Sequence, residues 1–495
     1  MHLVGHRIRP CAKEENRPNR ARTSVRNGSR GMFENGRRPI RRALPGVPGV
    51  GQPSRKMSSD VTPESASEGE SSPGFPVKHF WVIASVIFAI SVLKGLRLPN
   101  LWVATHMTFN YSQGFVRRGL IGELLWLLGG GRLYNYNFVV AWSYAFLVAV
   151  AVALALLLRK ILRKDGVRVG FRLAILVFAS SPATLFFVHM NGYYDHIGLL
   201  LVLLFIFFSP EDVARPRYRM FYLAGAICVF LAFIHETLII MFLPTLLFVL
   251  ASQTAAVLGR QEMKLKGKLV LAAHFVLTAA AGLIASVAIN AVGTRSPETI
   301  KALQLSMEKV AKFPLRGDAF EALARPIREN LFSLMPGHWR QSEPQGYLIR
   351  SFIVVLPGLV FLIYYGLALI GRTSVPKMAR LVMRISFLAA CLAPLSLHFV
   401  GWDAARWDTI CVICAFCCIA SMKISFSVEA GGLALEKTRP SSRLGVTLAL
   451  VVIALGIGSN NFLFDDVTVQ FFPFDRQFDF LIQWIKNGFT YLPPR

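Results

Sequence analysis

The stretch FNYSQGFVRRGLIGE, residues 109–123, lies between two apolar runs that are each long enough to enter a lipid bilayer. It carries two adjacent arginines, Arg117 and Arg118, and one acid, Glu123. An arginine beside hydrocarbon costs about 2.5 kcal/mol or more at the centre of a membrane, so it usually lies where something pairs with it. The glycines of the stretch allow backbone or ligand to approach closely. The stretch predicts an anion site at a membrane, with Arg117 and Arg118 as ligand contacts. The alternative is an interfacial helix whose arginines reach the lipid headgroups.

The composition of the whole chain is that of a membrane protein. Of its 495 residues 54% are hydrophobic and 17% are charged, and the mean hydropathy is +0.48. A soluble domain has about 45–50% apolar and about 25% charged residues. The net charge of +26 lies in loops and in an N-terminal tail, which excludes nucleic acid as the expected partner and leaves the lipid bilayer. Four of the seven cysteines fall in the apolar run 409–422 and are expected to be packing residues, so no metal site is predicted.

The first 78 residues are predicted to be a disordered cytoplasmic tail. Residues 1–56 contain 14 Lys and Arg against three Glu and show no apolar periodicity, so they cannot bury enough surface to offset the entropy lost on folding. One interpretation is that residues 1–56 are not native and that the natural chain begins at Met57.

Residues 79–495 are predicted to form an all-α, polytopic membrane domain. From residue 80 onward, apolar runs alternate with polar breaks, and we expect about 11 transmembrane helices. The runs are 80–96, 138–158, 173–188, 197–208, 220–234, 237–252, 269–292, 351–371, 385–400, 409–422 and 444–463. A large loop at 293–350, for which we expect surface helices beginning at Ser296, and a tail at 464–495 complete the domain.

The basic residues of the short loops predict the orientation of the chain. The loops 159–172 and 372–384 carry six and four Lys or Arg, whereas 189–196 and 235–236 carry none. Cytoplasmic loops are the basic ones, so the N-terminus is predicted in the cytoplasm and the C-terminal tail outside, across a bacterial inner membrane. Under this topology the loop 293–350 and nearly every unusual polar cluster lie on the external side.

Two of these clusters interrupt apolar runs. In HMNGYYDH, residues 189–196, a carboxylate stands among aromatic rings, which suits a sugar: Asp195 as base or hydrogen-bond acceptor, with Tyr194 and His196 as contacts. The alternative there is a tight turn in an interfacial aromatic belt. His235 and Glu236 divide an apolar stretch, and we expect a tight hairpin there, because such groups inside a membrane are costly unless they are paired or functional.

A third cluster, GWDAARWD, spans residues 401–408. Asp403 and Arg406 stand three positions apart, so at a helix start they would face one side and pair. Trp402 and Trp407 flank them. The cluster suits a sugar-phosphate site with stacking tryptophans, or alternatively an external cap with a structural ion pair.

This layout resembles the GT-C-type membrane glycosyltransferases and, more loosely, the bacterial polysaccharide polymerases. The resemblance is carried by many spans, an amphipathic first external segment, a large external loop, and Asp403 and Arg406 at an external helix end. It implies a polyprenyl-phosphate-linked sugar as ligand and an essential acid in the first external segment. Glu123 is the one acid of residues 97–137, so either Glu123 takes that role, or Asp195 or Glu236 does.

The predicted function is therefore a glycosyltransferase acting at the external membrane face in cell-envelope polysaccharide biosynthesis. The alternatives are a transporter or flippase of a lipid-linked glycan, in which broken helices and intramembrane ionisable residues also serve, and a non-catalytic component of polysaccharide assembly. The residue pattern does not indicate the sugar, the acceptor, a cofactor or the oligomeric state.

Overall fold

The computed structural model describes residues 77–164, 169–210, 217–260, 262–293, 296–401, 403–426, 443–458 and 482–489. The predicted disordered tail lies outside these ranges, except for its last two residues, and so do Trp402 and most of the predicted external tail 464–495.

The described residues form helices, turns and bends, with no strand, and this confirms the all-α prediction. The elements are α1 (Val77–Gly95), α2 (Leu101–His106), α3 (Leu120–Gly129), η1 (Gly130–Leu133), α4 (Tyr136–Lys164), α5 (Val169–Ser180), α6 (Pro182–His189), α7 (Asp195–Phe207), α8 (Tyr218–Ile234), α9 (Thr237–Arg260), α10 (Leu265–Val292), α11 (Pro297–Glu308), α12 (Gly317–Ala324), α13 (Ile327–Glu329), η2 (Asn330–Leu334), α14 (Met335–His338), α15 (Ser342–Gly371), α16 (Lys377–Leu392), η3 (Ala393–Phe399), α17 (Ala404–Ser425) and α18 (Arg443–Gly458).

Six of the helices are long and apolar enough to cross a membrane among the residues described, or seven if the pair α5 and α6, bent by 44°, counts as one broken span. Four further apolar helices have 10–17 residues, in α1, α7, α8 and α18. At 1.5 Å per residue such helices are shorter than a hydrocarbon core of about 30 Å. The count of 11 spans depends on these short helices and stays a prediction.

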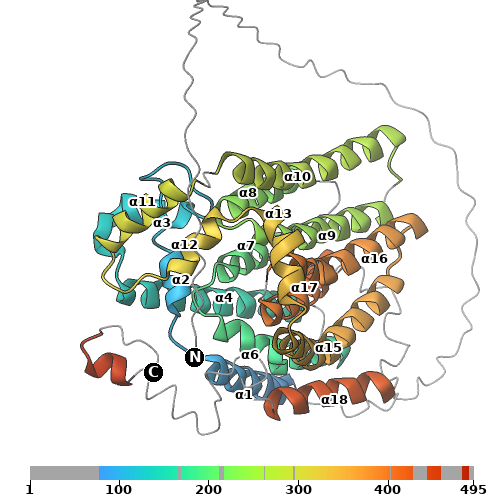
Figure 1. Ribbon diagram of the computed structural model, residues 1–495. Coiled ribbons are helices and arrows are strands. Elements are labelled where there is room, and N and C mark those ends of the chain that lie inside the picture. Colours follow the sequence, from blue (N-terminus) through green and yellow to red (C-terminus); the bar gives the residue numbers. More distant parts are fainter. Residues whose placement is uncertain are drawn as a thin grey trace, which may run out of the picture. The chain divides into compact units, whose positions relative to one another are not determined.

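Most of the long helices pack around α17, whereas α10 lies at the edge of the bundle against α8 and α9 (Figure 1). The most apolar 18 residues of α17 are all buried inside the protein. In α10, 17% of the corresponding stretch is buried. Helix α17 packs against α15, α9, α6 and α16. Its cysteines Cys411, Cys414, Cys417 and Cys418 are free thiols in this packed core, as expected from their apolar surroundings.

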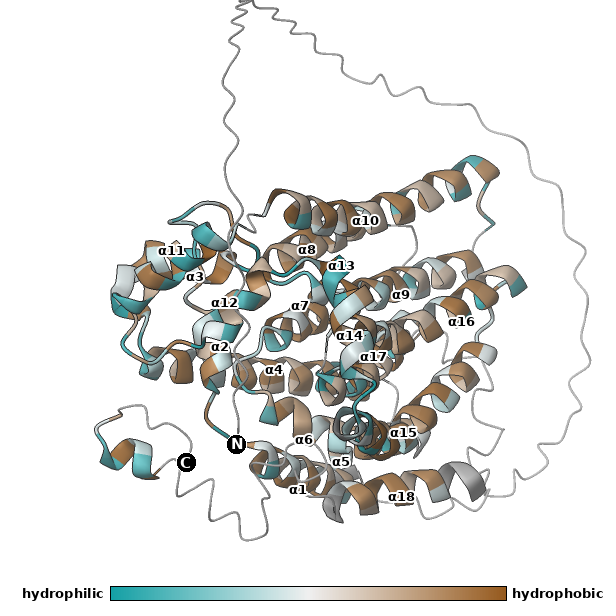
Figure 2. Ribbon diagram, viewed as in Figure 1, coloured by the Kyte–Doolittle hydropathy of each residue, from teal (hydrophilic) through white to brown (hydrophobic). Residues whose placement is uncertain are grey.

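One end of the helical bundle carries the short helices. In Figure 1, α2, α3, α11 and α12 gather at the left-hand end, and the far ends of α10 and α16 are hydrophilic in Figure 2. The loop 293–350 is helical, as expected: α11 begins after Ser296, whose hydroxyl accepts a hydrogen bond from the Thr299 N–H. Helix α14 forms at Met335–His338, and α15 begins at Ser342, nine residues before the predicted span.

Candidate functional site

The break between α8 and α9 places a carboxylate at the bundle end. His235 is extended, with φ −165° and ψ 125°, and ends α8; its ring Nδ1 accepts hydrogen bonds from the Thr237 N–H at 3.2 Å and from the Thr237 hydroxyl at 2.7 Å, at the start of α9. The predicted interruption of this apolar stretch is thus confirmed. Between the two helices, Glu236 is bound by Arg118, whose Nε and Nη2 donate to its two oxygens at 3.1 and 2.5 Å.

This ion pair keeps Glu236 ionised. Burial alone would raise the pKa of Glu236, but the charge and hydrogen bonds of Arg118, with the charge of Arg117, hold it well below its ordinary value. Arg118 itself has φ +62°, a left-handed conformation that costs a non-glycine residue roughly 1 kcal/mol or more. Such strain persists where surrounding contacts fix it, and here the carboxylate of Glu236 is that contact.

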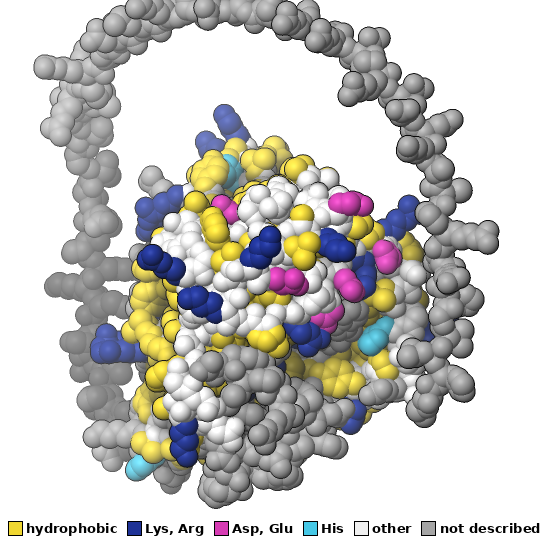
Figure 3. All heavy atoms as spheres, turned by 60° about the vertical axis from the view of Figure 1, so that its left-hand side comes forward, with side chains coloured by type: hydrophobic (Ala, Val, Ile, Leu, Met, Phe, Trp, Pro, Cys, Tyr) yellow, Lys and Arg dark blue, Asp and Glu magenta, His cyan; other side chains and the backbone are white. Residues whose placement is uncertain are grey.

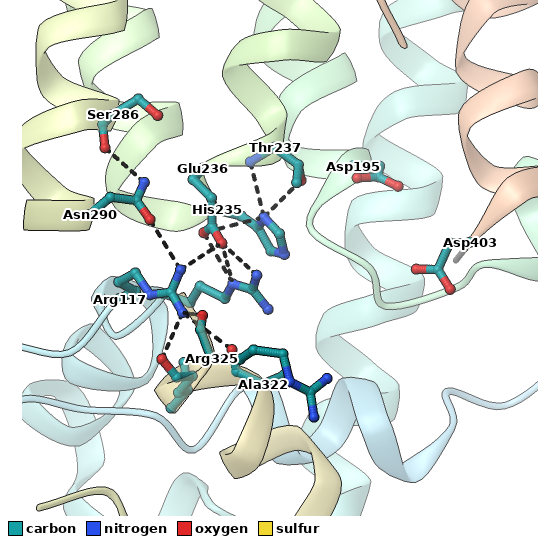
Figure 4. Close-up of polar contacts among 12 residues, drawn as sticks. Arg117, Asp195, His235, Glu236, Thr237, Ser286, Asn290, Ala322, Arg325 and Asp403 are labelled. Carbon is teal, nitrogen blue, oxygen red and sulfur yellow. Dashed lines mark hydrogen bonds and ion pairs between the residues drawn. The ribbon is translucent and has the colours of Figure 1, made fainter. Parts of the chain in front are cut away.

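Arg117 is engaged differently from its neighbour. It is 2% exposed, and its guanidinium donates to the Asn290 side chain at 3.0 Å and to the backbone carbonyls of Leu323 and Arg325 at 2.6 and 2.9 Å. Figure 4 shows Arg117 between Asn290 and Glu236 on α10 and the α8–α9 break, and the loop carbonyls on its other side. Arg117 therefore fastens the end of α12 to the helical bundle.

The glycines beside the arginines serve packing. A Cβ on Gly122 would lie 2.0 Å from the Phe109 carbonyl oxygen, and one on Gly119 would lie 2.5 Å from the Tyr111 ring. The expected close approach is therefore that of the chain's own backbone and rings. Glu123 accepts a hydrogen bond from the Tyr111 N–H at 2.8 Å, which joins the start of α3 to the same stretch of chain.

A second buried ion pair joins α7 to α17. Arg406 donates from Nε and Nη2 to both oxygens of Asp195, at 2.6 and 2.8 Å, and from Nη1 to Asp403 at 3.2 Å. The predicted pairing of Asp403 with Arg406 is confirmed. The guanidinium also lies over the rings of Tyr193 and Trp407, at 4.9 and 4.7 Å from their centres.

Both ion pairs border one pocket with a cavity of about 110 Å³. Its walls come from the segments predicted to be external: α2, the arginine stretch, the turn before α7, the α8–α9 break, the loop that follows α12, and the start of α17. Of the charged side chains, Arg118, Arg325, Asp403 and Arg406 line it. Figure 3 turns this end of the protein toward the viewer, and basic and acidic side chains are interspersed over it.

The predicted site residues differ in their relation to this pocket. Those that line it are Arg118, Tyr194, His235, Asp403, Arg406 and Trp407. Asp195, Glu236 and Arg117 stand behind it as ion-pair partners or anchors. His196 packs its ring against Phe187, at 4.3 Å between centres, and is absent from the lining, as is Glu123. Trp402 lies outside the described residues.

Among the pocket residues that the sequence did not predict are two ionisable side chains, His106 and Arg325. His106, on α2, lines the pocket and contacts the rings of Trp102 and Phe109 at 5.0 Å. Arg325 follows α12 and forms a long ion pair of 3.8 Å with Glu329. The signal for His106 was a single histidine in the otherwise apolar run LWVATHM.

A second cavity, of about 340 Å³, lies within the bundle. It is lined by side chains of α1, α4, α5, α6, α7 and α17 that are almost all apolar, such as Phe88, Leu147, Leu203 and Phe416. Its apolar lining is suited to binding a hydrocarbon chain. Among the described residues, no group of three or more His, Cys, Asp or Glu could hold a metal ion.

Comparisons with known proteins support membrane insertion. Neither curated proteins nor solved structures give a significant match. A family model described as uncharacterised membrane protein Rv1490 matches residues 77–311, which include both arginines, Asp195 and Glu236 but end before Arg325 and Asp403. With its long apolar helices and this similarity, the chain is a multi-pass integral membrane protein.

Proposed function

We propose that this protein is a glycosyltransferase of the bacterial inner membrane that transfers a sugar from a polyprenyl-phosphate carrier at the external face. The observation that carries the proposal is the convergence of six segments on one pocket lined by the Asp403 carboxylate, arginines and aromatic rings. Sugar rings stack on aromatic faces, and their hydroxyls bind carboxylates and imidazoles. The GT-C-like layout of the sequence points to the same chemistry.

Asp403 is the best-placed general base. Asp195 is fully buried and Glu236 is nearly so, and each is held by two donors of one arginine. The Asp403 side chain is 37% exposed, lines the pocket, and shares only one oxygen with Arg406. It can therefore accept a proton while Arg406 holds its position.

In the proposed reaction an acceptor hydroxyl attacks the anomeric carbon of the sugar, and its proton passes to Asp403. The bond between the anomeric carbon and the phosphate oxygen breaks, so that polyprenyl phosphate leaves with an added negative charge. Arg118 and Arg325 line the pocket and supply guanidinium donors for that charge. The 340 Å³ apolar cavity can bind part of the hydrocarbon chain.

The test is transfer of radiolabelled sugar from a polyprenyl-phosphate donor into lipid or polymer by the purified protein in membranes. Asp403→Asn should lower the rate by at least about a hundredfold, because general-base catalysis contributes roughly 10²–10⁴-fold. Asp318→Asn is the matched control, since Asp318 pairs with Arg316 on the exposed surface of α12 and does not line the pocket.

Transfer at the wild-type rate by Asp403→Asn would remove Asp403 as the base. Movement of an intact lipid-linked sugar across vesicle membranes, without transfer, would instead support the transporter alternative.

A further inference from the structure

The pocket offers hydrogen-bonding groups that its own ion pairs do not use. Arg118 is balanced by Glu236, and Arg406 is balanced by Asp195 and Asp403. By contrast, the ring nitrogens His106 Nε2 and Trp407 Nε1 have no hydrogen-bond partner among the described residues. Both residues line the pocket and are more than nine-tenths buried. A buried polar group left unpaired destabilises the protein, and a bound ligand that pairs with it would recover that free energy.

The third ring, His235, has a tautomer fixed by geometry. The Thr237 backbone N–H can only donate, so His235 Nδ1 must accept from it. A neutral ring then carries its proton on Nε2, which lies on the side of the ring away from Thr237 (Figure 4). His235 lines the pocket with its ring centre 6.4 Å from that of His106.

The two imidazoles are neutral at ordinary pH. Burial and then the charge of Arg118 hold the pKa of His106 and of His235 well below the usual histidine range, with Arg406 adding to the effect. A neutral imidazole offers one donor and one acceptor, as a hydroxyl does. The oxygens of an ionised phosphate only accept hydrogen bonds, so a phosphate cannot use the acceptor nitrogen of a neutral imidazole.

We propose that His106, together with Trp407 and His235, forms a specificity-determining contact for the hydroxyls of an uncharged, glycosyl part of the ligand. The anionic part is bound separately, by Arg118 and Arg325. This inference rests on the proposed function for the identity of the ligand, and it adds a residue, His106, and a division of the pocket into an uncharged and a cationic side.

The experiment measures ligand-induced shifts of the thermal unfolding midpoint for the purified full chain in lipid nanodiscs. The probes are a panel of methyl glycosides, for the uncharged side, and a short-chain prenyl phosphate, for the cationic side. In His106→Phe, which keeps the ring contacts but removes both nitrogens, the affinity for the glycoside that binds the wild type should fall roughly tenfold, and that for the prenyl phosphate should not change.

Two further variants separate recognition from misfolding. His106→Gln, with an amide that can reach the position of Nε2, should restore part of the glycoside affinity. His274→Phe is the matched control, because His274 lies on α10 with its ring bonded to Tyr222 and does not line the pocket; it should bind both probes as the wild type does.

The inference is overturned if no glycoside of the panel binds the wild type, or if His106→Phe weakens both probes equally. Glycoside binding that depends on His106 in a protein that transfers no sugar would sustain the inference and reject the proposed function. If His106→Phe still transfers sugar and binds the glycoside as the wild type does, the proposed function stands and the inference about His106 is rejected.

Discussion

At the residue scale, the adjacent arginines Arg117 and Arg118 have different roles: Arg118 lines the pocket, and Arg117 anchors the end of α12. Arg118 presents its guanidinium to Glu236 and to the pocket, and a lysine offers one point charge where the guanidinium offers two parallel donors. Arg118→Lys should therefore lower sugar transfer or prenyl-phosphate affinity roughly tenfold to a hundredfold, since a charge-assisted contact contributes about 1.5–3 kcal/mol. Expression and insertion should stay normal. Full activity in Arg118→Lys would show that this arginine serves only its ion pair with Glu236 and does not bind the phosphate.

Acid should destabilise the protein through its buried histidines. The pKa of His106 and of His235 is lowered in the folded state, so below the ordinary histidine pKa of about 6.5 the unfolded chain binds protons that the folded chain does not. The contribution of each neutral histidine to the free energy of unfolding is therefore complete above pH 6.5. As the pH falls below 6.5, this contribution decreases by up to about 1.4 kcal/mol per pH unit for each histidine. The unfolding midpoint should drop between pH 6.5 and 5.5. The drop should shrink in a His106→Phe/His235→Gln variant, and an equal drop in that variant would assign the effect to other groups.

Residue spacing predicted only the local part of the site. Asp403 and Arg406 are three positions apart, and their ion pair follows from helical geometry. The stronger partner of Arg406 is Asp195, which is 211 positions away in sequence, and no spacing rule connects them. The same holds for Arg118 and Glu236, 118 positions apart. Long-range pairing of buried charges is a consequence of how the helices pack.

At the scale of elements, the loop helices are held over the pocket through Arg117. Its guanidinium donates to the carbonyls of Leu323 and Arg325 at the end of α12, and Arg325 lines the pocket. Arg117→Met keeps the apolar stem but removes these donors, so the segment around α12 should open more often. We expect cleavage of residues 309–330 by an external protease to become at least several times faster. Arg328→Met, on the same segment, should cleave at the wild-type rate, and equal protection of Arg117→Met would show that other contacts hold the loop.

The packing of α3 against the arginine stretch depends on Gly122. A methyl group there would lie 2.0 Å from the Phe109 carbonyl oxygen, which is backbone and cannot rotate away. Gly122→Ala should therefore destabilise the protein by about 1–3 kcal/mol, the usual range for overpacking, and lower the unfolding midpoint. Gly114→Ala is an informative comparison, because its added carbon meets nothing within 4 Å and only its φ of +113° opposes the change. A midpoint unchanged by Gly122→Ala would mean that α3 can move away without cost.

Some helix boundaries could be predicted from the local sequence, and others could not. The helix break at His235 was predictable because His and Glu interrupt a long apolar stretch. The start of α15 at Ser342 was not, since its polar first turns lie outside the apolar run that marked the span. Helix ends that project beyond hydrocarbon are stabilised by contacts with other segments, such as the hydrogen bond from Trp339 Nε1 to the His398 carbonyl beside this start.

At the scale of the whole molecule, loop charge and pocket location give the same division of the chain. The clusters that the loop charges place outside meet at one pocket, and the basic turns after α9 and α15 lie at the far ends of their helices (Figure 1). A site built from one set of loops only is expected if all of them face the same compartment. The pocket therefore fits the predicted topology, in which these loops share one side of the membrane.

Impermeant thiol labelling of intact cells decides the side. Arg340 and Lys377 are both exposed, and α15 lies between them along the chain. In a cysteine-free background, Arg340→Cys should react with the reagent in intact cells and Lys377→Cys should not, because the loop 372–384 with its four Lys and Arg is predicted to be cytoplasmic. In permeabilised cells both should react, which controls for access. Labelling of Lys377→Cys in intact cells would invert the topology, place the pocket in the cytoplasm, and give the site a cytoplasmic sugar donor in place of the polyprenyl-linked one.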